Sequence, residues 1–230
     1  MSAAVARPGA LRRSPIDGWY GAATDDEFVR EDMAQPRLLR GAVAGGAPVT
    51  MTDVSWRRRF GLKGPGAESW LAMRAFSVPS AANSWAVADG VLVARLATSE
   101  FLVEALEADQ ARTADAASQL YAGDRPSGVY PVPRQDLVTR LRGAALNDLL
   151  RQTCSVDFAR LAKVPAGDAG PLVLTSMIGV AVVAIPRDSA GQRELTLWVD
   201  PSFAHYFWTT LLTVAADLGG GVLLNQPHGV

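Results

Sequence analysis

GPGAESWLAMRAFSVP (residues 64–79) and RGAALNDLLRQTCSVD (residues 142–157) are the two stretches that decide the fold. Each places a glycine before a helix-forming segment, and each leaves that segment through Ser-Val. Four residues of the first stretch recur 78 positions further along: Ala67, Leu71, Ser77 and Val78 return as Ala145, Leu149, Ser155 and Val156. The identities and the shared order of elements predict a pseudo-repeat.

The segments around the two stretches predict strands and helices in similar order. Apolar alternation predicts strands, and apolar residues at helical spacing predict helices. In the first half we expect strands over 54–62 and 90–96, and helices over 67–76 and 99–120, the last capped by Ser99. In the second half we expect extended chain from Tyr130, a helix over 144–152, strands over 137–141, 172–176, 178–185 and 194–199, and a closing helix from Asp200-Pro201 to Gly219. This pattern predicts an α+β fold of two pseudo-repeated βαβ-type halves, whose antiparallel or mixed sheets are faced by helices.

Composition changes along the chain suggest four segments. Residues 1–50 are rich in proline, glycine and alanine and are expected to form an extended N-terminal arm. Residues 51–125 and 126–222 are the expected half-repeats, and residues 223–230 form a tail. Within the arm, SPIDGWYG (residues 14–21) gathers apolar and aromatic side chains. They either fold back on their own domain or dock on another subunit.

The overall composition excludes several classes of protein. The chain has 230 residues, 49% of them hydrophobic, and a formal net charge of -1, so nothing favours nucleic-acid binding. A single cysteine excludes an internal disulfide and multi-cysteine metal sites, and it favours a cytoplasmic location. The longest apolar run, residues 177–185, is too short to span a membrane.

The only cysteine, Cys154, lies in RQTCSVDF (residues 151–158) and is the obvious candidate nucleophile. It aligns with Phe76 in the 78-residue register, which favours apolar packing. A reactive cysteine usually lies at a helix N-terminus or beside cations, whereas Cys154 follows a predicted helix. Asp157 is expected to cap the next turn. The histidines that could serve as partners are His205, expected at the surface, and His228, expected in the tail.

Other motifs give no further support for catalysis. GLKGPG (residues 61–66) lies between a strand and a helix, as phosphate-binding loops do, but it matches neither G-x-G-x-x-G nor the Walker pattern. A plain turn is the better interpretation. The chain contains neither G-x-S-x-G nor H-E-x-x-H. We therefore predict no catalytic, cofactor-binding or metal-binding residue in this chain.

The second half resembles the gamma subunit of heterotetrameric sarcosine oxidase and of N-methylglutamate dehydrogenase. That family runs through L-x-G-x-A, a helix ending in Cys-x-x-Asp, a threonine-bearing strand, and Ser-Phe-Ala before a tryptophan-rich helix. The matching residues, called the family positions below, are Gly143, Ala145, Cys154, Asp157, Thr175, Ser202, Phe203, Ala204 and Trp208. The leader LRRSPIDGWYG also resembles the family's Arg-Ser-Pro leader. The resemblance covers nearly all of residues 11–220 and is most specific over 140–210.

The resemblance implies a fold similar to that of the folate-binding aminomethyltransferases. It also implies a non-catalytic subunit that assembles with alpha, beta and delta subunits. FAD, FMN, NAD, tetrahydrofolate and zinc would be held by those partners and not by this chain. The complex would oxidise an N-methyl amine and pass the one-carbon unit to tetrahydrofolate. The rival hypothesis is a stand-alone folate-binding aminomethyl transferase with a pterin pocket between the two halves.

Overall fold

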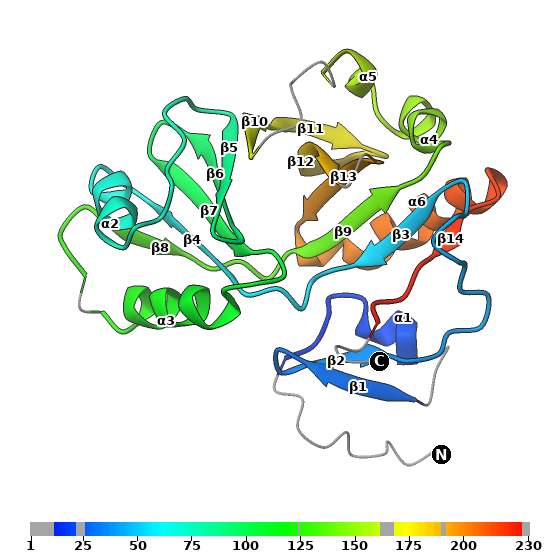
Figure 1. Ribbon diagram of the computed structural model, residues 1–230, viewed down its shortest axis with the longest axis horizontal. Helices are drawn as coiled ribbons and strands as arrows, with labels where there is room; N and C mark the ends of the chain where they lie inside the picture. The colour runs from blue at the N-terminus through cyan, green and yellow to red at the C-terminus, as the bar shows by residue number, and fades with distance from the viewer. Residues whose placement is uncertain (1–11, 22–25, 124, 162–167, 190–191, 227–230) are drawn as a thin grey trace.

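The computed structural model describes residues 12–21, 26–123, 125–161, 168–189 and 192–226. Two six-stranded sheets lie side by side, and a two-stranded hairpin lies below one of them (Figure 1). The fold is α+β, as predicted. All strand pairings of the two large sheets are antiparallel except one, in the part of the chain described.

The first sheet has the strand order β10-β5-β6-β7-β4-β8. Its strands are β4 (Arg59–Lys63), β5 (Ser84–Ala88), β6 (Val91–Ala97), β7 (Glu100–Ala105), β8 (Tyr130–Val132) and β10 (Ala169–Pro171). Helices α2 (Ala67–Met73) and α3 (Gln110–Tyr121) contribute to one apolar core with this sheet. Trp70 and Leu71 of α2 and Leu120 of α3 are buried in that core.

The second sheet has the strand order β11-β12-β13-β9-β3-β14. Its strands are β3 (Thr50–Asp53), β9 (Leu137–Arg142), β11 (Val173–Met177), β12 (Val180–Ser189), β13 (Gln192–Val199) and β14 (Gly221–Val222). Helices α4 (Leu146–Thr153), α5 (Phe158–Leu161) and α6 (Ala204–Asp217) pack on it, and a short 3-10 helix, η1 (Pro201–Phe203), precedes α6. Asp200 caps η1, because its side chain accepts a hydrogen bond from the Ser202 backbone N–H at 2.9 Å.

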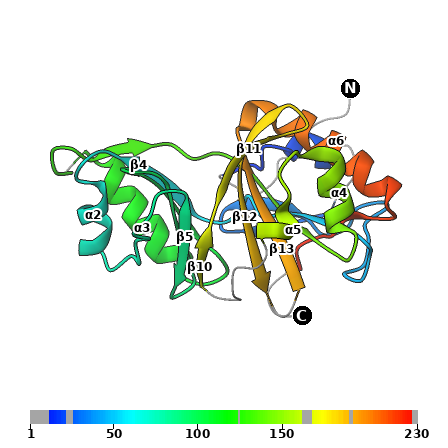
Figure 2. The same ribbon diagram turned by 90° about the horizontal axis from the view of Figure 1, so that it is seen from above.

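The two sheets share a third apolar cluster. Successive strand residues point to opposite faces, so Val91 and Val93 face α2 and α3 while Leu92 and Ala94 join the shared cluster. On β13 of the second sheet, Trp198 also joins the shared cluster. The residues before and after it point to the opposite face of the sheet, toward the helices. The helices therefore lie outside, and the remaining sheet faces meet each other (Figure 2).

Strands also pass between the two halves expected from the sequence. β3 belongs to the second sheet although the chain enters the first sheet directly afterwards at β4. β10 comes from the second half and pairs with β5 of the first sheet. The connection over residues 54–58 therefore crosses from one sheet to the other.

The 78-residue register of the sequence is not the register of the structure. α2 begins at Ala67 and α4 begins at Leu146, which are 79 positions apart. Ala67 is the first helical residue and is buried, whereas Ala145 is the N-cap of α4 and only partly buried. Gly64 and Gly143 open the two turns with φ of 114° and 127°, respectively. Added Cβ atoms there would lie 2.3 and 2.2 Å from carbonyl oxygens of Gly128 and Pro48, so both turns require glycine.

Two predicted elements are wrong. The strand predicted over 54–62 begins only at Arg59, because residues 54–58 form the connection between the sheets. The helix predicted over 99–120 contains strand β7 in its first part, and its helical part begins at Gln110 with Asp109 as N-cap. Ser99 therefore does not cap a helix but lies in the tight turn between β6 and β7.

The N-terminal segment contains helix α1 (Asp17–Gly21) and the hairpin of β1 (Glu27–Arg30) and β2 (Met33–Pro36). Ile16 and Tyr20 are buried in the core of the second sheet. The Trp19 ring contacts the Trp208 ring on α6, with centroids 5.6 Å apart. These side chains of SPIDGWYG thus fold back on their own chain, the first of the two alternatives. No helix in the described ranges has the length and apolar character that a membrane-spanning helix needs.

Candidate functional site

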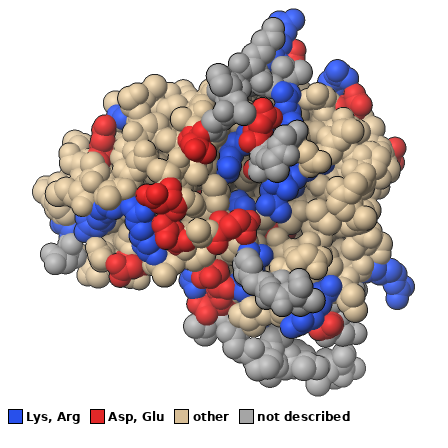
Figure 3. Space-filling view, viewed as in Figure 1, with Lys and Arg blue, Asp and Glu red and all other residues tan. Residues whose placement is uncertain are grey.

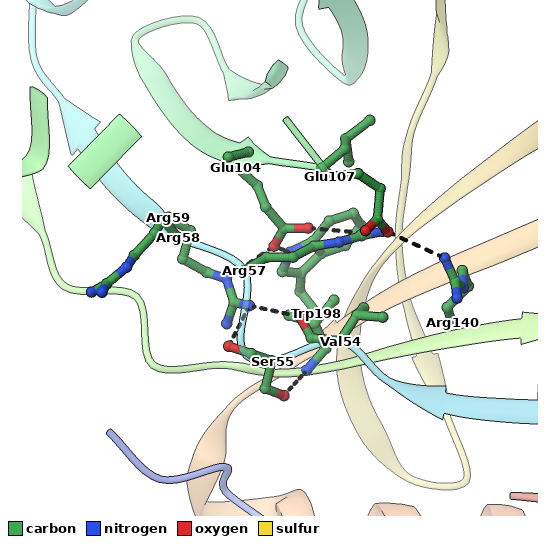
Figure 4. A network of polar contacts seen from close by, with 12 residues as sticks. Val54, Ser55, Arg57, Arg58, Arg59, Glu104, Glu107, Arg140 and Trp198 are labelled. Atoms are coloured by element: carbon green, nitrogen blue, oxygen red, sulfur yellow. Dashed lines mark hydrogen bonds and ion pairs between the residues drawn. The ribbon is translucent and has the colours of Figure 1, made fainter. Parts of the chain in front are cut away.

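A buried carboxylate, Glu104 on β7, lies where the two sheets meet (Figure 4). Its side chain is 0% exposed, and its oxygens are held by three donors. Arg59 Nε donates at 2.9 Å and Trp198 Nε1 at 2.8 Å, both to Oε2, and Arg57 Nη1 donates to Oε1 at 3.4 Å. Because Trp198 belongs to the second sheet, Glu104 bonds the two sheets through their interior.

The three consecutive arginines 57–59 have different partners. Arg59 also donates to the carbonyl oxygens of Ser55 at 3.0 Å and Asp136 at 2.8 Å. Arg57 pairs with Glu107 at 3.1 Å, and Glu107 also pairs with Arg30 at 2.8 Å. Arg58 turns to the β1–β2 hairpin, where it pairs with Asp32. The run therefore joins the sheets and the hairpin at one place.

Arginines outnumber carboxylates around this junction. Burial and the neighbouring Arg57 and Arg142 lower the pKa of Arg140 to about 10. Burial raises the pKa of Glu107, but the attraction of Arg57, Arg30 and Arg140 outweighs it, and the pKa of Glu107 lies below its ordinary value. The region is thus rich in cations that compete for few carboxylates.

A second buried carboxylate, Asp53 at the end of β3, fixes the leader. Ser14 Oγ donates to its Oδ2 at 2.5 Å, and the Ser55 backbone N–H donates to Oδ1 at 2.8 Å. Burial raises the pKa of Asp53 although these hydrogen bonds oppose the shift. Burial and the nearby Asp53 raise the pKa of Tyr20 as well. The serine of the Arg-Ser-Pro leader is therefore part of the folded core.

Next to this junction lies a cavity of about 360 Å³, which we call the arginine cavity. It is bounded by the leader, the connection over 54–58 and the loop before β9. Its lining includes Arg12, Arg13, Arg59 and Arg134, together with Ser55 and Asp136. On the face shown in Figure 3, acidic and basic side chains gather along the middle of the molecule.

The candidate nucleophile Cys154 is half-buried and follows α4. Its Sγ lies 3.9 Å from Thr175 Oγ1, and the Val156 backbone N–H points at the sulfur from 3.5 Å. The residue forms a β-bridge with Met177 and packs on the core of the second sheet. The structure thus brings together two family positions, Cys154 and Thr175, as a packing contact.

The remaining candidates are dispersed. Asp157 directly precedes α5, where its carbonyl accepts the Arg160 backbone N–H at 3.2 Å. His205 is exposed in the first turn of α6, and His228 lies outside the described residues. GLKGPG is a strand-to-helix turn in which the Gly66 N–H donates to the Gly128 carbonyl. No group of three or more possible metal ligands occurs in the described parts of the chain.

Sequence reasoning missed the junction. It treated 54–62 as one alternating strand and took Glu104 as a helix residue. The available signal was Arg57-Arg58-Arg59 inside an apolar segment, since an ordinary half-buried strand does not place charges at successive positions. Glu104, the carboxylate that pairs with Arg57 and Arg59, is 45 or more positions away, so the sequence alone did not identify it.

Comparison with known proteins relates this chain to solved structures but not to a family model. No protein-family model matches the chain, and no curated protein matches its sequence. The structure is similar to glycine cleavage system aminomethyltransferase T from Bartonella henselae, with a TM-score of 0.63 and 12% sequence identity. The match covers 93% of this chain and 60% of that chain, so this chain spans less than two thirds of that protein's length. At this identity the similarity shows an aminomethyltransferase-like fold.

Proposed function

We propose that this chain is a non-catalytic, gamma-type structural subunit of a flavin-dependent, heterotetrameric oxidoreductase that demethylates secondary amines. Its partners would be alpha-, beta- and delta-type subunits, which would hold FAD, FMN, NAD, tetrahydrofolate and zinc. The complex would oxidise an N-methyl amine of the sarcosine type and pass the one-carbon unit to tetrahydrofolate. Residues 1–50 would contribute to docking beyond the side chains already buried in this chain.

The observation that carries the proposal is how the family positions are used. Gly143 opens a turn that only glycine fits, and the Ala145 N–H bonds the Pro48 carbonyl at 2.9 Å. Cys154 and Thr175 pack together, and Trp208 contacts Trp19 of the leader. None of these nine family positions lines the arginine cavity, although Arg12, Arg13 and Pro15 of the leader do. Residues shared with the gamma subunits thus fix turns and packing, which supports a structural role.

Glu104 supports the same role. A general base needs a carboxylate that can accept a proton from a substrate. Both Glu104 oxygens already accept hydrogen bonds from buried arginine or tryptophan donors. The most buried charged group of the junction is therefore arranged to hold two sheets together.

Exposed apolar side chains support docking. Phe203 and Tyr206 at the start of α6 are 51% and 52% exposed, and Leu174 on the edge strand β11 is 53% exposed. Phe203 is itself a family position. Large exposed apolar side chains are candidates for a surface that meets a partner.

A pull-down tests the proposal. The tagged chain, expressed in its own cells, is expected to co-purify with a flavin-bearing subunit, while the chain expressed alone is colourless. Phe203→Ser together with Tyr206→Ser should weaken recovery of the partners without changing the unfolding of the chain, and Met73→Ser, which changes a more exposed apolar residue on α2, is the control. A stable monomer that recovers no flavoprotein would contradict the proposal.

The second candidate is a stand-alone folate-dependent one-carbon transferase. Two observations favour it: the fold resembles an aminomethyltransferase, and a cavity lies where the two sheets meet. Trp56 and Trp198 lie at this junction and would report on an occupied cavity. Saturable quenching of tryptophan fluorescence by tetrahydrofolate would favour this candidate, and unchanged fluorescence would favour the structural subunit.

A further inference from the structure

The arginine cavity holds more positive charge than its own carboxylates neutralise. Two of its arginines are paired: Arg13 with Asp17 at 2.7 Å, and Arg59 with Glu104 at 2.9 Å. Arg12 donates to the carbonyl oxygens of Glu31, Ser55, Trp56 and Arg57, which carry no net charge. Within the described residues no carboxylate lies within ion-pair distance of Arg12. Burial, followed by repulsion from Arg58 and Arg59, lowers the pKa of Arg12 to about 10.

Arg134 is the second incompletely paired cation of the cavity. Its terminal nitrogens lie 3.6 Å from Glu100 Oε1 and 3.6 Å from Asp136 Oδ1, which is beyond hydrogen-bonding distance. Its Nε is buried without a hydrogen-bond partner in the described structure. Arg134 thus keeps a forked set of donors that the protein does not use.

Asp136 gives the cavity a single opposing charge. Its side chain is buried, and its Oδ2 has no hydrogen-bond partner among the described residues. The Asp136 backbone carbonyl, by contrast, accepts a hydrogen bond from Arg59. A ligand that enters here meets several arginines and one carboxylate.

We propose that the arginine cavity binds a small organic anion through its carboxylate, with Arg134 as the recognising residue and Arg12 as a further positive charge. A carboxylate matches the planar fork of arginine and accepts two parallel hydrogen bonds. A volume of about 360 Å³ lies at the small end of ligand pockets, which suits a ligand of amino-acid size. Asp136 favours ligands that also carry an amine, since it is the one carboxylate among the described residues that line the cavity. This inference does not depend on which of the two proposed functions is correct.

Titration calorimetry of the full chain with glutarate and with glutamate tests the inference. Glutarate is expected to bind with a Kd of about 1 mM or tighter, and glutamate should bind more tightly if the amine meets Asp136. Arg134→Gln should weaken binding by roughly tenfold or more, because it removes a charge-assisted pair of hydrogen bonds. Arg151→Gln, which changes an arginine 74% exposed on α4, should bind as the unchanged chain does.

Several results would overturn the inference. They are the absence of saturable binding, equal affinity in Arg134→Gln, and equal affinity for inorganic phosphate and glutarate. Tetrahydrofolate that binds while glutarate does not would also contradict it. If Arg134→Gln fails to fold, Arg134→Lys serves instead: it keeps the charge and loses the fork, so glutarate affinity should still fall.

Discussion

Glu104 and Asp136 are both buried carboxylates beside Arg59, yet their surroundings differ. Glu104 accepts hydrogen bonds from Arg57, Arg59 and Trp198. Asp136 has one side-chain oxygen without a partner in the described structure, and its other oxygen lies 3.6 Å from Arg134. Buried carboxylates therefore join two sheets where both of their oxygens accept hydrogen bonds, and they leave a cavity able to bind where one oxygen has no partner in the described structure.

The largest effect is expected from removing the charge of Glu104. Glu104→Gln leaves Arg59 buried without a counter-charge and leaves Arg57 with only the half-exposed Glu107, and breaking a buried pair costs about 3–5 kcal/mol. Urea unfolding followed by fluorescence measures this loss. A loss below about 1 kcal/mol would mean that Glu104 does not hold the junction.

The hydrogen bond between the sheets can be isolated with two tryptophans. Trp198→Phe removes the donor to Glu104, whereas Trp208→Phe removes an Nε1 that is buried without a partner in the described structure. Both side chains are almost fully buried, so both variants lose similar apolar area. Trp198→Phe should destabilise the chain by about 1.5–3 kcal/mol more than Trp208→Phe, the value of a hydrogen bond to a charged group. Equal losses would show that packing alone matters at Trp198.

Helices α2, α4 and α6 and strands β6, β9, β11, β12 and β13 could be predicted because their periodicity is local. α2, α4 and α6 carry apolar residues at helical spacing, and β13 is rich in strand formers. Prediction failed at β7, where Glu100, Glu104 and Ala105 favour a helix in isolation. Glu104 is in a strand because its carboxylate meets Arg59 directly opposite on β4, a pairing over 45 positions.

The candidate site could be predicted only in part. The sequence analysis correctly placed Cys154 in packing and His205 at the surface. The junction and the arginine cavity depend on the leader, the 54–58 connection and the loop at 134–136 coming together. No local sequence pattern encodes this contact, because the leader sequence by itself predicts little structure. The position of the leader depends on Ile16 and Tyr20, which pack in the core of the second sheet.

Glu107 tests the opposite case, a carboxylate that is paired but exposed, and the expected loss of stability is smaller. It pairs with Arg30, Arg57 and Arg140, but its side chain is 53% exposed and solvent screens the pairs. Glu107→Gln should therefore cost less than about 1 kcal/mol. Because its folded-state pKa is lowered, its contribution is present above the unfolded pKa and is lost as the pH falls through the folded pKa. High salt should remove most of the difference in the free energy of unfolding between Glu107→Gln and wild type. A loss of stability as large as that of Glu104→Gln would show that buried and exposed pairs do not differ here.

The smallest effect, with the reverse dependence on pH, is expected at Asp136. Burial raises the pKa of Asp136, although Arg134 and Arg59 oppose the shift. A raised folded-state pKa means that wild-type stability falls as the pH rises from the unfolded pKa, about 3.9, through the folded value. Asp136→Asn keeps the shape and the backbone bond to Arg59 but cannot ionise, so it should escape this loss. We expect the variant to be within about 1 kcal/mol of wild type at pH 7 and to gain relative to it as the pH rises. Urea unfolding across the acid range measures the difference. A variant that becomes relatively less stable as the pH rises would show that Asp136 is paired as Glu104 is.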